Sequence, residues 1–198
     1  MPEKNLHEAF VDEIRDIYDA ERQITKALPK MIKKASSEEL RSALEGHLEE
    51  TRGQIDRLEQ VFQELDETVK GKHCDGIAGV LEEGKAIMEE EMDEAAMDAC
   101  LIAAGQRVEH YEMAAYGTLV AWARVMGHDD VADLLQETLD EEKTADEKLS
   151  MIGEGGINRE AADNAHGNGN GHRTPARAPR QAKRSTTRRA ATTKRKSR

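Results

Sequence analysis

The sequence predicts an all-α protein in which four long amphipathic helices form a bundle and a shorter helix connects the second to the third. Charged residues make up 35% of the chain and aromatic residues only 3%, which excludes a large aromatic core. Gly and Pro are scarce before residue 153, whereas Ala, Leu, Glu and Met are plentiful, as is typical of long helices. Apolar residues recur at alternating steps of three and four, the spacing of one helical face.

The first two helices are predicted from this spacing and from their caps. The first should run from about Leu6 to Ala35, with Pro29 bending or loosening its last turns. Ser36 and Ser37, followed by two glutamates, are a good N-cap for the second helix. That helix should extend to about Val69.

The connection that follows is too long for a simple up-down-up-down bundle. Residues 71–76 break the helical pattern, and a shorter helix is expected over about 77–92. Roughly twenty residues or more therefore separate the second and third long helices, whereas helix connections in simple bundles usually take 2–8. Two helical hairpins joined by one long crossover match the ferritin-like way of connecting a bundle.

The third helix is expected over about 94–126, with Gly127 as its C′ residue, and the fourth over about 129–152. Glycines at 153, 155 and 156 should end the fourth helix. We therefore expect a bundle domain over residues 1–152, a flexible Gly/Asn-rich linker over 153–172, and a disordered Lys/Arg-rich tail over 173–198.

Charge divides the chain in the same way. The net charge is −11, but eleven of the 29 Lys and Arg residues lie after residue 172. That leaves 18 basic against 40 acidic side chains in residues 1–172, a net charge of −22. An acidic body joined to a basic tail predicts two separate functions in one chain.

Each long helix carries an acid on or beside the face that should be buried. Glu21 takes a position between Ile17 and Ile24 where an apolar residue is expected. The others are Glu50 in the second helix, Glu109 and Glu112 in the third, and Glu142 in the fourth. Grouped carboxylates in a low-dielectric core need compensation. Basic residues are absent from these faces, so the negative charges must be compensated by shared protons or by metal cations. Oxygen ligands with at most one nitrogen suit iron or manganese.

Four segments resemble the YciF/YciE stress proteins, a ferritin-like family related to rubrerythrin. They read YDAERQ at 18–23, HLEETRGQIDRL at 47–58, VEHYEMAAYGTL at 108–119 and ETLDEEK at 137–143. The resemblance covers about residues 4–152. It implies a dinuclear centre of two iron ions, with manganese as the alternative, held by Glu21, Glu50, Glu109, Glu112 and Glu142.

The sequence departs from the usual pattern of such centres, in which two helices carry Glu-x-x-His. Gly53 follows Glu50 by three residues, and Ala145 follows Glu142 by three. Candidates to complete the site are His47, Gln54 and Asp146. His47 is equally interpretable as a hydrogen-bonded core histidine. Tyr18 and Tyr116 could donate hydrogen bonds to the ligands or carry an electron, or they could simply be core tyrosines whose hydroxyls are satisfied.

The basic tail has no aromatic residues for base stacking, so it should bind nucleic acid through phosphates alone. The alternative is that it binds the acidic bundle of its own or another copy. The basic residues of the tail are Arg173, Arg177, Arg180, Lys183, Arg184, Arg188, Arg189, Lys194, Arg195, Lys196 and Arg198.

The leading hypothesis is a cytoplasmic protein, favoured as a homodimer, that oxidises Fe²⁺ with peroxide or O₂ in stress defence and binds DNA through its tail. The alternative is a non-enzymatic, nucleoid-associated or structural stress protein with a vestigial or structural metal. Iron storage is a third idea, but the sequence has no feature of a cage. Two distant cysteines without a CxxC motif fit a reducing compartment, and no apolar run predicts a signal peptide or membrane span.

Overall fold

The structure is a computed structural model that describes residues 3–167. All regular elements in this range are helices, and it contains no strand. The last residues of the predicted linker and all of the basic tail, from Arg173 to Arg198, lie outside the described residues. Among the helices of residues 3–167, none is both long and apolar enough to cross a membrane.

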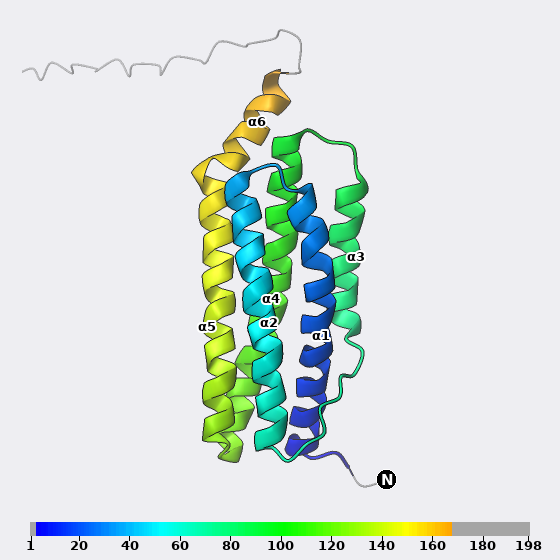
Figure 1. Cartoon of the computed structure of the whole chain (residues 1–198), viewed down its shortest axis with the longest axis vertical. Coiled ribbons are helices and arrows are strands. Elements are labelled where there is room, and N and C mark those ends of the chain that lie inside the picture. Colours follow the sequence, from blue (N-terminus) through cyan, green and yellow to red (C-terminus); the bar gives the residue numbers. More distant parts are fainter. Residues whose placement is uncertain (1–2, 168–198) are drawn as a thin grey trace, which may run out of the picture. The chain divides into compact units, whose positions relative to one another are not determined.

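Helices α1 (Leu6–Lys34) and α2 (Glu38–Glu64) form the first antiparallel hairpin (Figure 1). Asn5 and Glu8 cap α1 reciprocally, with a 3.0 Å bond from the Glu8 amide to the Asn5 side chain. Ser37 caps α2, as predicted. The helix ends at Glu64, five residues before the predicted end, because Asp66 takes a left-handed backbone conformation (φ 54°) that a helix cannot continue.

Helix α3 (Asp75–Glu89) is the crossover predicted from the connection length. It packs against α4 and α1 outside the four-helix core. The segment before it is tied to α1, because the Cys74 amide donates to Asp19 at 3.0 Å and the Lys72 amide to the Arg15 carbonyl at 2.9 Å. In Figure 1, α3 returns the chain to the end of the bundle where α2 began, so α4 runs parallel to α2.

Helices α4 (Glu94–Met126) and α5 (Asp129–Ile152) form the second hairpin, with the bounds that the sequence predicted. Gly127 between them has φ 79°, a conformation open to glycine at little cost, and its amide bonds to carbonyls of the last turn of α4. Helix α5 packs against both α4 and α2, and α1 against α2 and α4, which closes the bundle.

The chain does not become a linker at residue 153, so that prediction is wrong up to Gly167. A π-helical turn, η1 (Gly153–Ile157), follows α5 directly and leads to α6 (Asn158–Gly167). Only Gly156 departs from helical backbone angles. Helix α6 packs against α4, and this tertiary contact offsets the low helix propensity of the glycines.

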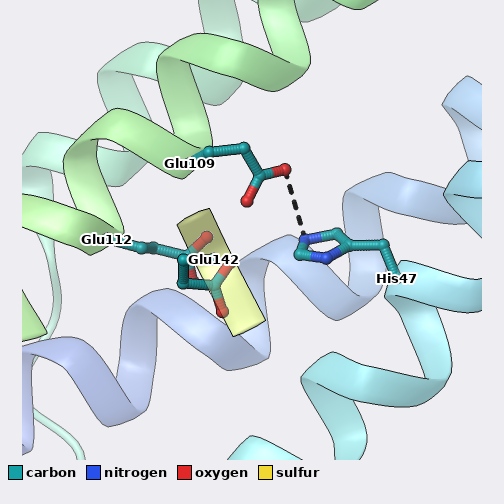
Figure 2. Close-up of side chains that lie close together, drawn as sticks. All are labelled: His47, Glu109, Glu112 and Glu142. Carbon is teal, nitrogen blue, oxygen red and sulfur yellow. Dashed lines mark ion pairs between the residues drawn. The ribbon is translucent and has the colours of Figure 1, made fainter. Parts of the chain in front are cut away.

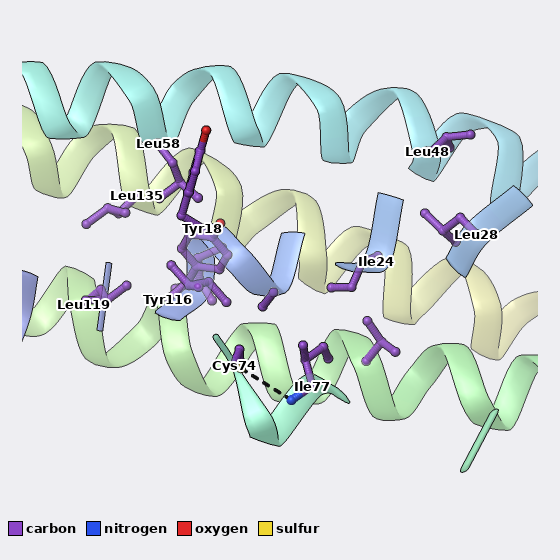
Figure 3. Close-up of a cluster of buried hydrophobic side chains, with 14 of the residues drawn as sticks. Tyr18, Ile24, Leu28, Leu48, Leu58, Cys74, Ile77, Tyr116, Leu119 and Leu135 are labelled. Carbon is purple, nitrogen blue, oxygen red and sulfur yellow. Dashed lines mark hydrogen bonds between the residues drawn. The ribbon is translucent and has the colours of Figure 1, made fainter. Parts of the chain in front are cut away.

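The core runs through the middle of the four long helices. Tyr18, Leu58, Tyr116, Leu119 and Leu135 come together from all four of them (Figure 3). Each fully buried aliphatic or aromatic side chain contributes roughly 1.5–3 kcal/mol through the hydrophobic effect. The predicted fold class, a ferritin-like four-helix bundle with a short crossover helix, is confirmed for residues 3–167.

Candidate metal centre

Four glutamates lie at the centre of this apolar core. Glu21 of α1, Glu112 of α4 and Glu142 of α5 are fully buried, and Glu109 of α4 is 3% exposed. Glu109 and Glu112 are three residues apart and therefore share a face of α4. The helical spacing thus brings acids from three helices to one depth of the bundle, as the sequence predicted for these four. We refer to them as the carboxylate cluster.

Helix α2 contributes a histidine to the same place. His47 is 6% exposed, and one ligand atom from each of His47, Glu109, Glu112 and Glu142 lies within 4.8 Å of the others. Figure 2 shows these four side chains converging from α2, α4 and α5. The His47 Nε2 atom lies 3.5 Å from a Glu109 oxygen. The sequence left open whether His47 is a core histidine or a ligand; the geometry places it where a ligand would be.

Burial makes ionisation of the cluster unfavourable. Loss of solvation raises the pKa of Glu21 to about 8, with repulsion from Glu142 as the next cause. Desolvation also raises the pKa of Glu109 and of Glu112 well above the ordinary value, and repulsion from Glu21 adds to the effect on Glu112. The pKa of Glu142 is raised for the same reason. Without a cation, burial therefore favours the protonated form of these carboxyls.

Two neutral groups orient the cluster. Tyr116, fully buried, donates a hydrogen bond from its hydroxyl to Glu21. Gln54, also fully buried, donates from its amide to Glu142 and, at 3.0 Å, to Glu141. Both residues were predicted near the site. Tyr18 was also predicted there, but its hydroxyl donates to Glu59 at 2.9 Å instead.

Arg57, which was not among the predicted site residues, holds Gln54 in place through Glu141. Arg57 donates to both oxygens of Glu141, at 2.9 and 2.8 Å, and to the Thr138 hydroxyl at 2.7 Å. Because Glu141 also accepts from Gln54, Arg57 fixes the amide one step removed from the cluster. The available signal was the spacing of Arg57 three residues after Gln54, on a neighbouring face of α2.

Most polar atoms of the site have no hydrogen-bond partner, which is the test of whether a cation fits. Buried native carboxylates are normally satisfied. Five of the eight oxygens in the carboxylate cluster are buried and unpartnered, including both of Glu112, as are both ring nitrogens of His47 and the Gln54 carbonyl. Among the described residues, no Lys or Arg pairs with the cluster. A set of unpartnered oxygens with one imidazole is a donor set that fits iron or manganese.

Glu50 and Asp146 are not brought into this group. The Glu50 side chain is 53% exposed, with an oxygen 3.8 Å from His47 Nδ1. The expectation that all four long helices bury an acid is therefore wrong for α2, where the histidine takes that place. Asp146 accepts from Gln106 at 3.0 Å and lies 3.4 Å from His110 Nε2. Its partners thus account for it without a ligand role.

The sequence of the chain is similar to that of known proteins. The model of a family described as a domain of unknown function, DUF892, matches residues 5–162. Protein YciF of Escherichia coli strain K12 is 41% identical over 166 residues, which cover 83% of this chain and all of that protein.

Solved structures agree with this likeness. The structure of the E. coli stress protein YciF matches with a TM-score of 0.76 at 40% identity, covering 79% of this chain and 99% of that one. YcfI of Rhodopseudomonas palustris, for which a structural role has been suggested, matches with a TM-score of 0.73 at 46% identity, covering 74% and 94%. A Xanthomonas campestris protein at 23% identity and a TM-score of 0.63 shares the fold, over 82% of this chain and 99% of that one.

Proposed function

The chain belongs to the DUF892 family of YciF-like proteins, and we propose that it is a di-iron protein, with manganese as the alternative metal, that oxidises Fe²⁺ with peroxide or O₂ in stress defence. The observation that carries the proposal is the set of buried, unpartnered carboxylate oxygens beside His47. Apolar burial of four acids costs several kcal/mol each unless a cation or protons compensate.

The ligand set follows from the contacts. His47, Glu109, Glu112 and Glu142 would hold one ion, since their ligand atoms lie within 4.8 Å of one another. Charges on Glu21 and Glu142 act on both Glu109 and Glu112, so the four acids lie close together. Four carboxylates suit two ions. Glu21 would then help to hold the second ion.

The residues of the chain favour oxidation of the bound metal. When bound, iron supplies a one-electron Fe²⁺/Fe³⁺ couple. Four carboxylates against one imidazole stabilise the higher charge of Fe³⁺ over Fe²⁺. Tyr116 and Gln54 hold Glu21 and Glu142 in place, and apolar side chains surround most of the cluster. The absence of histidine at residues 53 and 145 leaves the site richer in oxygen than the usual pattern.

The test is iron oxidation by the metal-free full-length chain. Addition of Fe²⁺ with H₂O₂ or O₂ should form Fe³⁺, followed by its near-ultraviolet absorbance, faster than in buffer alone. The isosteric double variant Glu109→Gln, Glu112→Gln should lose this activity, whereas Glu49→Gln, whose side chain is exposed, should keep it. A wild-type rate equal to that of buffer would contradict the proposal.

A second candidate is a non-enzymatic structural or nucleoid-associated protein that carries a structural metal. The suggested structural role of the R. palustris relative supports it, as does the single histidine of the site. The iron-oxidation assay distinguishes the two candidates. A protein that binds two ions but does not accelerate iron oxidation would support the structural role.

We further propose that the basic tail binds DNA without sequence preference, through phosphate contacts. Its eleven Lys and Arg residues and its lack of aromatic residues support this. A chain truncated after Gly167 should lose DNA binding and keep iron oxidation. A full-length chain whose DNA affinity is insensitive to salt, or equal to that of the truncated chain, would contradict it. We also propose that the protein is a homodimer and acts in the cytoplasm. Sedimentation measures the mass of the assembly, and a cage-sized particle would favour iron storage instead.

A further inference from the structure

A cavity of about 70 Å³ lies between α2 and α5 and reaches the candidate metal centre. Its inner wall includes His47 and Glu109, which are buried. Its outer wall includes Glu50 and Lys148, which are exposed. Since a water in the liquid takes about 30 Å³, the cavity has room for an ion with one or two waters, and it joins the surface to the cluster.

His47 divides this cavity between an outer and an inner acid. Its Nδ1 atom lies 3.8 Å from an oxygen of Glu50, and its Nε2 atom lies 3.5 Å from an oxygen of Glu109. Neither nitrogen is exposed or hydrogen bonded. Glu50, His47 and Glu109 thus form a continuous line of possible metal ligands, from a side chain that is 53% exposed to one that is 3% exposed.

The other small cavity that reaches His47 and Glu109 has a different chemistry. It is about 10 Å³, and the remainder of its wall is apolar, including Ile24, Leu28 and Val108. A hydrated cation loses its water in such a passage without replacement ligands, at high cost. A charged ion therefore has one polar approach to the cluster among these two.

Two opposite charges stand at the mouth of the polar cavity. Glu50 attracts cations, and its pKa is lowered, first by His47 and also by the positive charge of Lys148. Lys148 repels cations, and no ion pair within 4 Å joins it to Glu50. Charges that line a narrow opening change association rates by about 10- to 1,000-fold.

We propose that this cavity is the entry route by which divalent metal ions reach the carboxylate cluster, with Glu50 and His47 binding the ion in transit and Lys148 slowing its entry. The inference rests on the proposed metal centre. It assigns Glu50 to the path rather than to the final ligand set, in keeping with its exposure.

The experiment measures the rate of Co²⁺ uptake by the metal-free full-length chain, followed by stopped-flow absorbance. Glu50→Gln should lower the second-order rate about tenfold, and Lys148→Glu should raise it by a similar factor. The matched controls are Glu49→Gln and Lys143→Glu, which make the same charge changes on the same helices outside the cavity. Both controls should stay within about twofold of wild type, because exposed charges outside the cavity are screened by water and salt.

The outcomes separate the route from the centre. A faster Lys148→Glu variant beside an unchanged Lys143→Glu variant supports the route. If each cavity variant and its matched control change the uptake rate equally, the proposed route is wrong. The proposed metal centre is unaffected by that result as long as the variants bind the normal amount of Co²⁺ at saturation. A Glu50→Gln variant that binds one ion fewer at saturation also overturns it, because Glu50 is then a permanent ligand. A wild type that takes up no Co²⁺ overturns both.

Discussion

Two regions of helix α4 bury a carboxylate in opposite ways. Asp98 is 2% exposed and accepts three hydrogen bonds from the loop between α1 and α2: Ser36 N at 2.9 Å, Ser36 Oγ at 2.6 Å and Ser37 N at 2.8 Å. Glu112, four turns further on, is fully buried, and neither of its oxygens has a partner. Burial of an acid is therefore not itself a functional signal. The presence or absence of donors separates a structural carboxylate from a candidate ligand.

The largest effect on stability should come from removal of the Asp98 carboxylate. Asp98→Ala should lower the free energy of unfolding by about 3 kcal/mol, because it removes three hydrogen bonds to a buried carboxylate and leaves a cavity in its place. Urea denaturation of the metal-free chain measures this. Asp93→Ala, which removes the exposed N-cap of α4 and a 3.2 Å hydrogen bond from Asn164, is the control and should cost about 1 kcal/mol. Equal losses would mean that the three bonds to Asp98 contribute little.

Bound metal should stabilise the folded protein through the carboxylate cluster, which includes Glu112, and not through Asp98. At a free Mn²⁺ concentration a hundredfold above the dissociation constant, the free energy of unfolding of wild type should rise by about 2.7 kcal/mol for each ion bound. Asp98→Asn should keep this increment from its own lower baseline, whereas Glu109→Gln, Glu112→Gln should lose it. An equal Mn²⁺ increment in the double variant would place the ion elsewhere.

A histidine can be added where the usual Glu-x-x-His pattern has one. Ala145 lies three residues after Glu142 and lines the polar cavity together with His47 and Glu109. Ala145→His should therefore supply a second nitrogen ligand and tighten Mn²⁺ binding about tenfold, which is about 1.4 kcal/mol. Isothermal titration calorimetry measures the affinity. Ala145→Leu fills the same space without a ligand atom, and comparable tightening there would contradict the explanation.

The stability of the metal-free protein should also depend on pH. The pKa of Glu21 is about 8 in the folded chain, above its ordinary value near 4.5. Its contribution to stability is therefore fully present below about pH 4.5 and is lost as the pH rises toward and through 8. Glu21→Gln should remove this loss and flatten the dependence of the unfolding free energy on pH between pH 5 and 8. Parallel curves for wild type and variant, from thermal unfolding with chelator present, would contradict the assigned burial.

Much of this comparison is present in the sequence. Glu21, Glu109, Glu112 and Glu142 were found because they take apolar positions in a helical pattern, and Gln54 because it continues the same stripe. Asp98 was missed, although Leu101 and Ile102 follow it by three and four residues and mark the same buried face. The sequence does not say which donors another loop will bring to an acid, so satisfied and unsatisfied carboxylates look alike until the chain is folded.

The errors have physical causes as well. At about 100° per residue, Glu50 lies about 50° off the stripe that joins His47 to Gln54, and in a thin bundle that offset is enough to reach solvent. Glycines after Ile152 were expected to end the helix, but a π-helical turn and the contact of α6 with α4 continue it. Tertiary packing overrides a weak local preference in that case.

The most direct test of the central claim is the number of metal ions bound per chain. The protein is purified without a histidine tag, loaded anaerobically with Fe²⁺, freed of excess ion and analysed for metal, beside Glu109→Gln, Glu112→Gln and the exposed control Glu49→Gln. We expect close to two irons per chain in wild type and control, and close to none in the double variant. A wild type that binds no iron or manganese would contradict it, and the buried acids would then be compensated by protons alone.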